Sequence, residues 1–471
     1  MWDKGINLLI VLIVFIYQFG FIWAIPYLIF FVFILDHIIP SFGYERITNF
    51  DLMLVYLSEL FNTNISIFME IDKIDFENFE KKVHQRLITA IVRMRQVPVS
   101  YFGFYFWKEV DIQLARQQVK NLDMHFEDEA SFFEYFNRFT NERMEKGKPL
   151  FEFGLIEDYT EDTSMIIFRC EHSFGDGVSC ASMLSALNDD QFSIPSKKVL
   201  PSYGFWQKLI FAFTTFSTLG EADKKYKEVK TDECTKKIFK KNNMQTSDTR
   251  HTFTNTEIPF EAIHKCYKRY EGMTFNDFAL AICGKSFYQY CKQEGIEDPK
   301  LLRCSIAVAH KILPTGYFNL SIKNYLVLIN LQLYLTDSIK SGYEKIKPFL
   351  SYILSPDIQK QLVNFNFIAP YVPKSFLLNL MIGGSKESYF CNSNVAFSDR
   401  PYFICGKQVR KLRLFNNNCL GEGLLGFIFT YNNKVTFTAC VVEKSDFDGE
   451  KYTDLVMANI QEEIDSLPKQ T

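Results

Sequence analysis

Glu171-His172-Ser173-Phe174-Gly175-Asp176-Gly177 is the stretch that decides which fold this chain is expected to adopt. It closes the hydrophobic run from Ser164 to Cys170, which we interpret as a β-strand. Successive strand side chains face opposite ways, so His172 is expected on the face of Phe168 and Cys170, with Glu171 on the other. An apolar environment keeps an imidazole neutral and able to accept a proton. The pattern therefore predicts a histidine base at the end of a strand.

Asp176 lies between two glycines, which we expect to permit a sharp turn, and a helix is predicted to begin near Val178. A histidine beside a Gly-Asp-Gly turn can also be purely structural, and the spacing alone favours that interpretation. Asp176 is expected to fix the loop by pairing with an arginine, Arg169 or Arg303, rather than to act as a second base. The motif needs support from elsewhere in the chain before a function can be inferred.

That support comes from several matches in a fixed order. The stretch resembles the H-H-x-x-x-D-G signature of the wax ester synthase/diacylglycerol acyltransferase family, a branch of the chloramphenicol-acetyltransferase-like and condensation-domain acyltransferases. The further segments that resemble family motifs are Lys148-Pro149-Leu150-Phe151-Glu152, Thr274-Phe275-Asn276-Asp277, Leu302-Arg303, Ser393-Asn394-Val395 and Gly421-x-Gly423-Leu424. The resemblance spans about Ile47 to Asp448, nearly everything outside the first segment.

The resemblance implies an α/β fold, an α+β sandwich with the two lobes of chloramphenicol acetyltransferase, joined here to an N-terminal membrane segment. A length of 471 residues agrees with two lobes that each have a core. The predicted divisions are an anchor at 1–40, a first lobe at 46–200 that carries the histidine motif, a crossover at 201–250 and a second lobe at 251–471.

Within the lobes, hydrophobic spacing predicts individual elements. Ile65 to Ile71 alternates as a strand, and Phe76 to Val92 has the spacing of an amphipathic helix. Leu150 to Ile156 is expected to pair with Ser164 to Cys170 across a polar turn, so that a hairpin presents the motif.

The N-terminus differs from the rest, because no charged residue occurs from Ile6 to Leu35. This run is too long for the apolar region of a signal peptide and predicts a retained membrane anchor. A helix of that length exceeds the thickness of the hydrocarbon core, so a single pass and a re-entrant hairpin broken near Gly20 and Pro26 both remain possible. The predicted location is the endoplasmic reticulum membrane, with the catalytic domain in the cytosol.

The segment at Thr274 predicts a helix start. Thr274 is a good N-cap, and Asp277 three residues later completes a capping-box-like arrangement. For Asp277 we favour this structural role. For Asn276 a structural role and stabilisation of an oxyanion are equally open, since the second requires that the helix end face His172. Ser393 and Asn394 are taken, with Gly177, as motif residues that support the site.

Two departures from the family pattern stand out. The first histidine of the family's pair is Glu171 here, but strand alternation turns that position away from the pocket, so chemistry is expected to survive. Ala396-Phe397-Ser398-Asp399 replaces the proline and glycines that follow S-N-V in the family. We expect this altered loop to affect the choice of substrate.

The family's activity implies a function. Its members esterify diacylglycerol or long-chain alcohols with fatty acyl-CoA, which gives triacylglycerol or wax ester, and we expect His172 to be the general base, with Asp176 in support. Acyl-CoA is a co-substrate, and we expect no cofactor and no metal. One alternative is an inactive lipid-binding or scaffold protein that keeps the fold; another is an acyltransferase with a soluble acceptor.

Composition narrows the partners. The net charge of −3 and pI near 6.2 offer no broad basic surface, so nucleic acid is not expected. The 11 cysteines are scattered without a C-x-x-C pair and suit buried thiols in a reducing compartment. The expected partners are acyl-CoA, a lipid alcohol and the bilayer, and the oligomeric state stays open.

Overall fold

The computed structural model describes residues 13, 34, 38–47, 49–101, 103–190, 229–239, 248–309, 320, 322–324, 326–353, 374–385, 388–417, 423–443 and 445–468. The predicted anchor at 1–40 falls almost entirely outside these ranges, as do most of the predicted crossover at 201–250 and Gly421. Within the described ranges, no helix combines the length and the apolar composition that crossing a bilayer requires.

The first lobe is built on a six-stranded sheet with the order β13-β14-β2-β7-β6-β5. Its strands are β2 (Asn64–Asp72), β5 (Val119–Asn121), β6 (Phe151–Ile156), β7 (Thr163–Glu171), β13 (Phe403–Ile404) and β14 (Lys407–Asn416). The predicted hairpin is confirmed, since β6 and β7 pair antiparallel with Phe151 opposite Cys170. The central strand β2 is buried on both faces along most of its length, although the polar residues Ser66 and Glu70 interrupt its apolar residues.

The second lobe is built on a seven-stranded sheet with the order β11-β10-β12-β15-β16-β8, and β9 also pairs with β16. Its strands are β8 (Thr249–Phe253), β9 (Ile258–Pro259), β10 (Leu301–Ala309), β11 (Leu326–Tyr334), β12 (Phe390–Ser398), β15 (Leu424–Tyr431) and β16 (Lys434–Val442). β15 and β16 form an antiparallel hairpin, and its turn residues Asn432 and Asn433 have φ of 51° and 56°, as a two-residue turn between strands requires.

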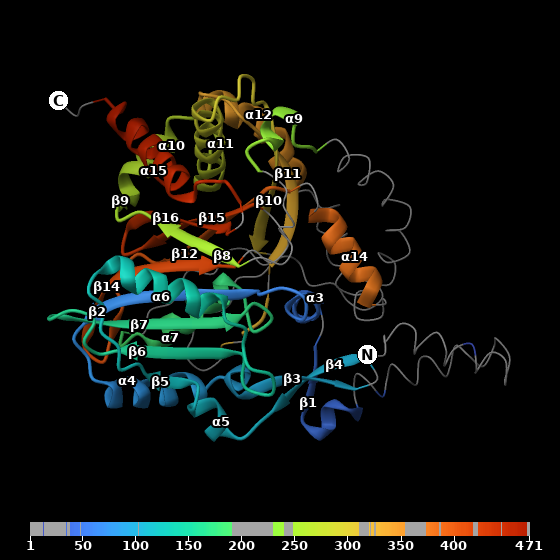
Figure 1. Cartoon of the computed structure of the whole chain (residues 1–471), viewed down its shortest axis with the longest axis vertical. Helices are drawn as coiled ribbons and strands as arrows, with labels where there is room; N and C mark the ends of the chain where they lie inside the picture. The colour runs from blue at the N-terminus through green and yellow to red at the C-terminus, as the bar shows by residue number, and fades with distance from the viewer. Residues whose placement is uncertain are drawn as a thin grey trace.

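One strand ties the lobes together. β14 lies in sequence between β12 and β15 of the second sheet, but it pairs antiparallel with β2, from Val409 opposite Ile71 to Asn416 opposite Ile65. The structure thus places residues 403–416 in the first lobe, whereas the sequence assigned them to the second. Local hydrophobic patterning shows that a strand exists, but it does not show which sheet the strand joins. Figure 1 shows β14 beside β2, below the second sheet.

The helices cover the outer faces of the two sheets and fill the space between them (Figure 1). The helices are α3 (Asn49–Ser58), α4 (Phe76–Val83), α5 (Ile112–Arg116), α6 (Glu129–Asn141), α7 (Gly177–Leu187), α9 (Glu233–Lys236), α10 (Phe260–Lys268), α11 (Phe275–Gln293), α12 (Ile339–Ile353), α14 (Lys374–Ser385) and α15 (Gly449–Asp465). Helices α10, α11, α12 and α15 lie on the second sheet's outer side, and α7 contacts β12 between the lobes.

The helix predicted over Phe76 to Val92 is shorter than expected. Asp75 caps α4 by accepting a hydrogen bond from the Asn78 backbone N–H, and α4 ends at Val83. A π-helical turn, His84–Ile88, continues the chain, and a 3-10 turn, Val92–Arg95, follows. The hydrophobic spacing of the segment is therefore carried by three short helical pieces.

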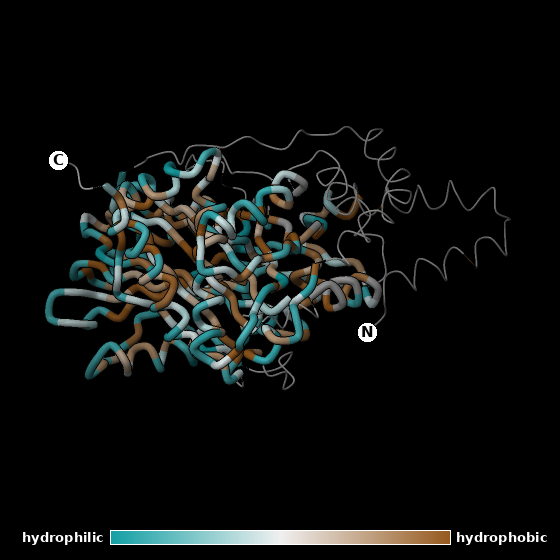
Figure 2. Tube along the Cα trace, turned by 90° about the horizontal axis from the view of Figure 1, so that it is seen from above, coloured by the Kyte–Doolittle hydropathy of each residue, from teal (hydrophilic) through white to brown (hydrophobic). Residues whose placement is uncertain are grey.

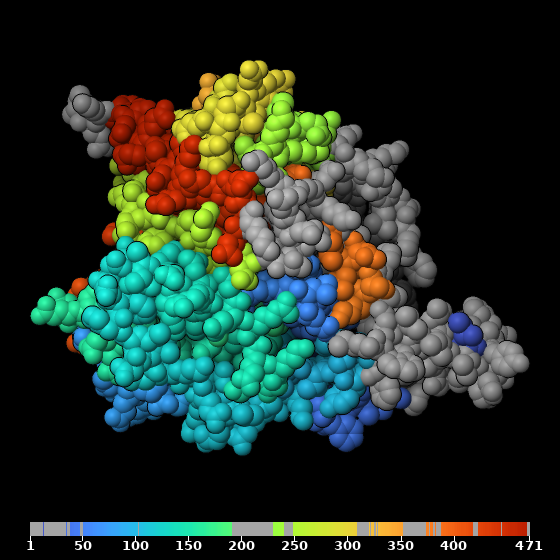
Figure 3. Space-filling view, viewed as in Figure 1, coloured from blue at the N-terminus to red at the C-terminus, as the bar shows by residue number. Residues whose placement is uncertain are grey.

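A third, three-stranded sheet, ordered β1-β4-β3, lies at the edge of the first lobe. Its strands are β1 (Tyr44–Arg46), β3 (Gln96–Tyr101) and β4 (Phe104–Glu109). Apolar segments run through the interior of both lobes and hydrophilic ones lie mostly at the periphery (Figure 2). The lobes meet along a seam, beside which α14 contacts α3 (Figure 3).

Candidate active site

His172 lies one residue beyond β7, at the seam between the lobes. Its backbone N–H donates to the carbonyl of Thr63 at 2.9 Å, which extends the pairing of β7 with β2 by one residue. The side chain is 7 % exposed. The β6–β7 hairpin thus holds the His172 ring in the interior, at the end of a strand whose position is fixed by pairing.

Asp176 acts as the N-cap of α7. Its Oδ1 accepts a hydrogen bond from the backbone N–H of Ser179 at 2.8 Å, and the predicted helix does begin at this point. This is a favourable place for a carboxylate, because the first N–H groups of a helix lack partners within the helix. Asp176 therefore fixes the direction in which the chain leaves His172.

The two glycines that flank Asp176 serve a different purpose from the one predicted. Neither has a positive φ, so the turn does not require glycine for its backbone conformation. A Cβ on Gly175 would lie 2.8 Å from Ile322 Cγ2, and a Cβ on Gly177 would lie 3.1 Å from Val395 Cγ2. Both positions are small because segments of the second half of the chain pack directly against this loop.

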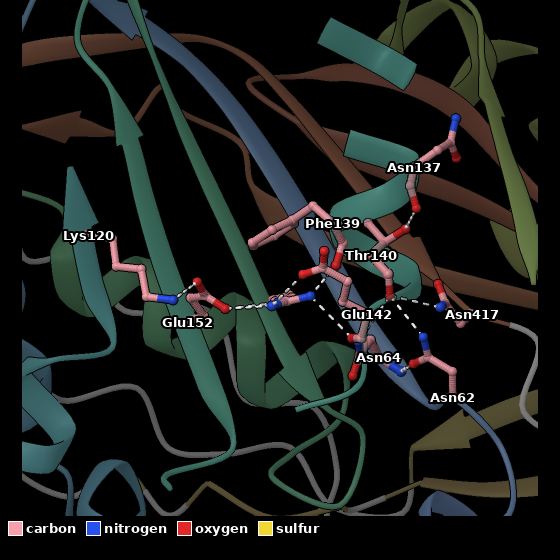
Figure 4. Close-up of polar contacts among 10 residues, drawn as sticks. Asn62, Asn64, Lys120, Asn137, Phe139, Thr140, Glu142, Glu152 and Asn417 are labelled. Carbon is pink, nitrogen blue, oxygen red and sulfur yellow. Dashed lines mark hydrogen bonds and ion pairs between the residues drawn. The ribbon is translucent and has the colours of Figure 1, made fainter. Parts of the chain in front are cut away.

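Arg169, one of the two arginines expected to pair with Asp176, pairs with Glu152 instead. Its Nη2 and Nε lie 2.7 and 3.1 Å from Glu152 Oε2, and Lys120 donates to the same carboxylate at 2.5 Å. Its guanidinium also lies 4.1 Å from the centroid of the Phe139 ring. Figure 4 shows Glu152 with Lys120 on one side and the guanidinium group on the other. Strand alternation puts this face of β7 opposite to that of His172, so the glutamate of the Lys148–Glu152 motif has a structural role.

A hydrogen-bonded chain holds the His172 ring. Nδ1 lies 2.9 Å from Oδ1 of Asn324, and Nδ2 of Asn324 donates to the His172 carbonyl and to Oδ1 of Asp51, both at 2.8 Å. The reversed amide would place an oxygen against those two acceptors, so Oδ1 must face the ring. Nδ1 therefore carries the proton, and Nε2 is left with its lone pair.

Asp51 anchors that chain from α3. It also accepts from the Asn324 backbone N–H at 2.8 Å and lies 3.9 Å from Nη2 of Arg93, whose guanidinium stacks 3.8 Å from the Trp107 ring centroid. Burial raises the pKa of Asp51 to about 6, although Arg93 opposes the shift. No motif in the sequence pointed to Asn324 or Asp51, because residues so far apart along the chain become neighbours only in the folded protein.

The pKa of His172 is lowered below its usual value by burial, which outweighs the opposing effects of the local hydrogen bonds and of the negative charge on Asp176. The imidazole is thus neutral at physiological pH, as the strand pattern predicted. A neutral ring with the proton fixed on Nδ1 can accept a proton at Nε2.

A small cavity of about 60 Å³ adjoins His172. Among the described residues that line it, His172, Ser393 and Asn416 have polar side chains with oxygen or nitrogen atoms. Its apolar walls include Phe50, Leu54, Leu57, Leu326, Leu328 and Phe427. The ring is accordingly not enclosed by packing on all sides.

The alternation of β12 separates the motif residues. Ser393 lines the cavity, together with Cys391 and Val395. Asn394 faces the other side, where its Nδ2 donates to Oδ1 of Asn276. Asn276 therefore lies on the face of the second sheet away from His172, in a structural contact, and the structure does not bring it to the cavity.

Thr274 and Asp277 form the predicted capping box of α11. Thr274 Oγ1 accepts from the Asp277 backbone N–H at 3.3 Å, and Asp277 Oδ2 accepts from the Thr274 backbone N–H at 2.8 Å. Asp277 thus has the structural role that we favoured. The segment predicted as an altered loop after Ser393 is instead part of β12, which runs to Ser398, because no proline or glycine interrupts it.

Glu171 faces away from the cavity, as alternation required. Its Oε1 accepts from Ser173 Oγ at 2.5 Å, and burial raises its pKa. The replacement of the family's first histidine therefore changes no group that lines the cavity.

Comparison with solved structures gives the same architecture repeatedly. The wax ester synthase/diacylglycerol acyltransferase from Marinobacter aquaeolei superposes with a TM-score of 0.60 at 15% identity, covering 89% of this chain and 98% of that one. The fold is that of the chloramphenicol-acetyltransferase-like condensation domains. The trichothecene 15-O-acetyltransferase from Fusarium sporotrichioides gives 0.63 at 11% identity, covering 88% and 95%. The starter condensation domain of rhizomide synthetase, solved with C8-CoA and Leu-SNAC, gives 0.57 at 10% identity, covering 92% and 99%. No protein-family profile and no curated protein matches the sequence.

Proposed function

We propose that this protein is an acyltransferase that moves a fatty acyl group from acyl-CoA to a lipid hydroxyl, that of diacylglycerol or a long-chain alcohol, with His172 as general base. The observation that carries the proposal is the His172 ring: it is neutral, its Nδ1 proton is directed to Asn324, and it borders an apolar cavity. Support also comes from the fold, since neighbours of the same architecture include a wax ester synthase/diacylglycerol acyltransferase and an O-acetyltransferase.

The proposed reaction proceeds by direct attack. Nε2 of His172 removes the proton of the acceptor hydroxyl while the oxygen forms a bond to the thioester carbonyl carbon. The carbon–sulfur bond then breaks, and the departing CoA thiolate takes the proton from the imidazolium. Ester and free CoA result, and His172 returns to its starting state.

Stabilisation of the negative carbonyl oxygen requires a hydrogen-bond donor in the cavity. The Ser393 hydroxyl is the candidate, because it lines the same cavity as His172. Each such donor contributes about 100- to 1,000-fold to the rate, and a general base about 100- to 10,000-fold. Asp176 acts indirectly, by holding the loop that carries His172.

The apolar walls of the cavity favour lipid substrates over polar acceptors. The uncharged run from Ile6 to Leu35 agrees, because an anchored enzyme meets lipid acceptors at a high local concentration. We also propose that the enzyme is located at the endoplasmic reticulum membrane with its catalytic lobes in the cytosol. A volume of about 60 Å³ holds only a few water-sized groups, so the cavity walls must part for substrate.

The small cavity also favours a second candidate, a lipid-binding or scaffold protein without catalysis. Membranes containing the full chain, given labelled oleoyl-CoA with either diacylglycerol or hexadecanol, distinguish the two. We expect labelled triacylglycerol or wax ester from the wild type, and a loss of about 100- to 10,000-fold in His172→Ala. The exposed His125 provides a matched control, His125→Ala, which should keep full activity. No product from the wild type with either acceptor would favour the scaffold.

A further inference from the structure

Asn416 is a buried polar residue that the proposed reaction has not used. It ends β14, is 8 % exposed and lines the cavity with His172 and Ser393. Among the described residues, its Oδ1 has no hydrogen-bond partner. Buried carboxamide groups are nearly always hydrogen-bonded, so an unpaired one that borders a cavity is a candidate group for binding a substrate.

The next residue, Asn417, shows what a structural asparagine looks like at this point of the chain. Its backbone N–H donates to the Asn64 carbonyl at 2.9 Å, its Nδ2 donates to the Thr140 carbonyl at 2.9 Å, and its Oδ1 lies 3.0 Å from Nε2 of His251. Figure 4 shows the bond between Asn417 and Thr140, and the three bonds together fix the end of β14. The fold therefore does not depend on the carboxamide of Asn416 to hold the strand.

The strand register sets the distance between Asn416 and the base. Asn416 is opposite Ile65 of β2, and Ile65 is opposite Cys170 of β7, so these three side chains share one face. His172 follows two residues after Cys170, on the same face. Two strand spacings across and two residues along put the Asn416 and His172 Cα atoms about 12 Å apart.

That separation decides which part of an acyl-CoA each residue reaches. The thioester carbonyl must lie beside the hydroxyl that His172 deprotonates, and the separation of the two Cα atoms favours contact of Asn416 with a group farther along the donor. The nearest other polar group of the donor is the first amide of the pantetheine arm, a short ethylene spacer beyond the sulfur. A carboxamide complements a secondary amide, because it accepts from the N–H and donates to the C=O.

We propose that Asn416 recognises the secondary amide nearest the thioester sulfur of a pantetheine-type acyl donor. This assignment rests on the proposed acyl transfer and specifies the donor class for it. A long-chain alcohol has no second N–H or O–H close to its reacting hydroxyl that could donate to Asn416 Oδ1. The acyl donor, by contrast, takes part in both proposed reactions.

The test compares two thioesters of the same fatty acid, one of N-acetylcysteamine, which has the amide, and one of a simple alkanethiol, which lacks it. We expect the wild type to prefer the first by about tenfold or more in kcat/KM, since an unpaired polar group in the site disfavours the analogue. Asn416→Leu, of similar size, should lose about tenfold on the amide-bearing thioester only, so that the preference disappears. Asn416→Ser provides a second variant if the leucine impairs folding.

Equal losses on both thioesters, or a preference that survives in Asn416→Leu, would overturn the assignment. Asn417→Leu is the matched control, and its folded fraction should keep the preference. A separate measurement removes the dependence on turnover: binding of the thioether S-decyl-CoA, followed by calorimetry, should weaken about tenfold in Asn416→Leu. If Asn416→Leu binds S-decyl-CoA as tightly as the wild type does, Asn416 has no role in recognising the donor, whether or not the protein transfers an acyl group. If binding weakens but no acyl transfer is found, only the proposed reaction is refuted.

Discussion

His172 and His251 are both buried histidines near the seam between the lobes, and burial lowers the pKa of both. Their rings are held differently. Both nitrogens of His251 face side-chain oxygens, with Nδ1 2.8 Å from Asn137 Oδ1 and Nε2 3.0 Å from Asn417 Oδ1. Among the described residues, only Asn324 holds the ring of His172, through Nδ1.

Burial and a lowered pKa therefore do not by themselves show that a histidine is a general base. His251 joins β8 to α6 and to the end of β14, and it has no nitrogen left for a substrate. His172 keeps a nitrogen available beside an apolar cavity. The availability of that nitrogen, and not the shifted pKa, separates a candidate catalyst from a structural residue.

The largest expected effect distinguishes the two histidines by activity. His172→Ala should lower kcat/KM by about 100- to 10,000-fold, because the general base is lost, with little change in stability. His251→Leu should leave the kcat of the folded protein close to that of the wild type. Acyl-transfer assays with thermal unfolding of both variants provide the measurement, and a full loss of activity in folded His251→Leu would contradict the comparison.

The next effect concerns stability against pH. The pKa of His251 falls to about 4 in the folded protein from about 6.5 unfolded, so its neutral form stabilises the fold fully above pH 6.5. This contribution, about 3 kcal/mol, is lost as pH falls from 6.5 through 4. Urea unfolding of wild type and His251→Leu between pH 7 and 4 tests it, since the difference between the two proteins should narrow towards low pH. A constant difference would refute it.

A smaller effect is expected from the group that orients the catalytic ring. Asn324→Leu removes the acceptor that fixes the proton on Nδ1, and kcat/KM should fall by about tenfold or more. Asp51→Asn keeps a hydrogen-bonding side chain next to Asn324, so its kcat/KM should fall less than that of Asn324→Leu. Both variants need a thermal unfolding measurement, because Asn324 also bonds to Asp51. Unaltered kcat/KM in folded Asn324→Leu would show that the tautomer is fixed in another way.

The smallest effect is a shift of the pH profile. Because the pKa of His172 lies below its usual value, the decline of kcat/KM as the ring is protonated should have its midpoint at a lower pH than an ordinary histidine would give. In Asp176→Asn the nearby negative charge is gone, so the decline should move to lower pH still. A movement to higher pH would be inconsistent with that charge acting on His172.

Much of the site's local geometry could be predicted from the sequence. The hairpin of Leu150–Ile156 with Ser164–Cys170 and the capping box of Thr274 and Asp277 are confirmed, because each depends on residues close in sequence. The orientation of Glu171 away from the cavity follows from the same alternation. Of the two arginines that we expected as partners of Asp176, Arg169 and Arg303, the first is not the partner, since it points to the opposite face of the sheet and pairs with Glu152.

What the sequence alone determined was the position of a histidine at a strand end, its neutral state and the helix that follows Asp176, since these are set by alternation and by local hydrogen bonds. Only the tertiary structure decided that β14 inserts beside β2, that Asn324 and Asp51 hold the ring, and that Asn416 reaches the cavity. Each of these joins segments hundreds of residues apart or lying in different lobes. Such contacts depend on how two sheets pack, which no local pattern of side chains encodes.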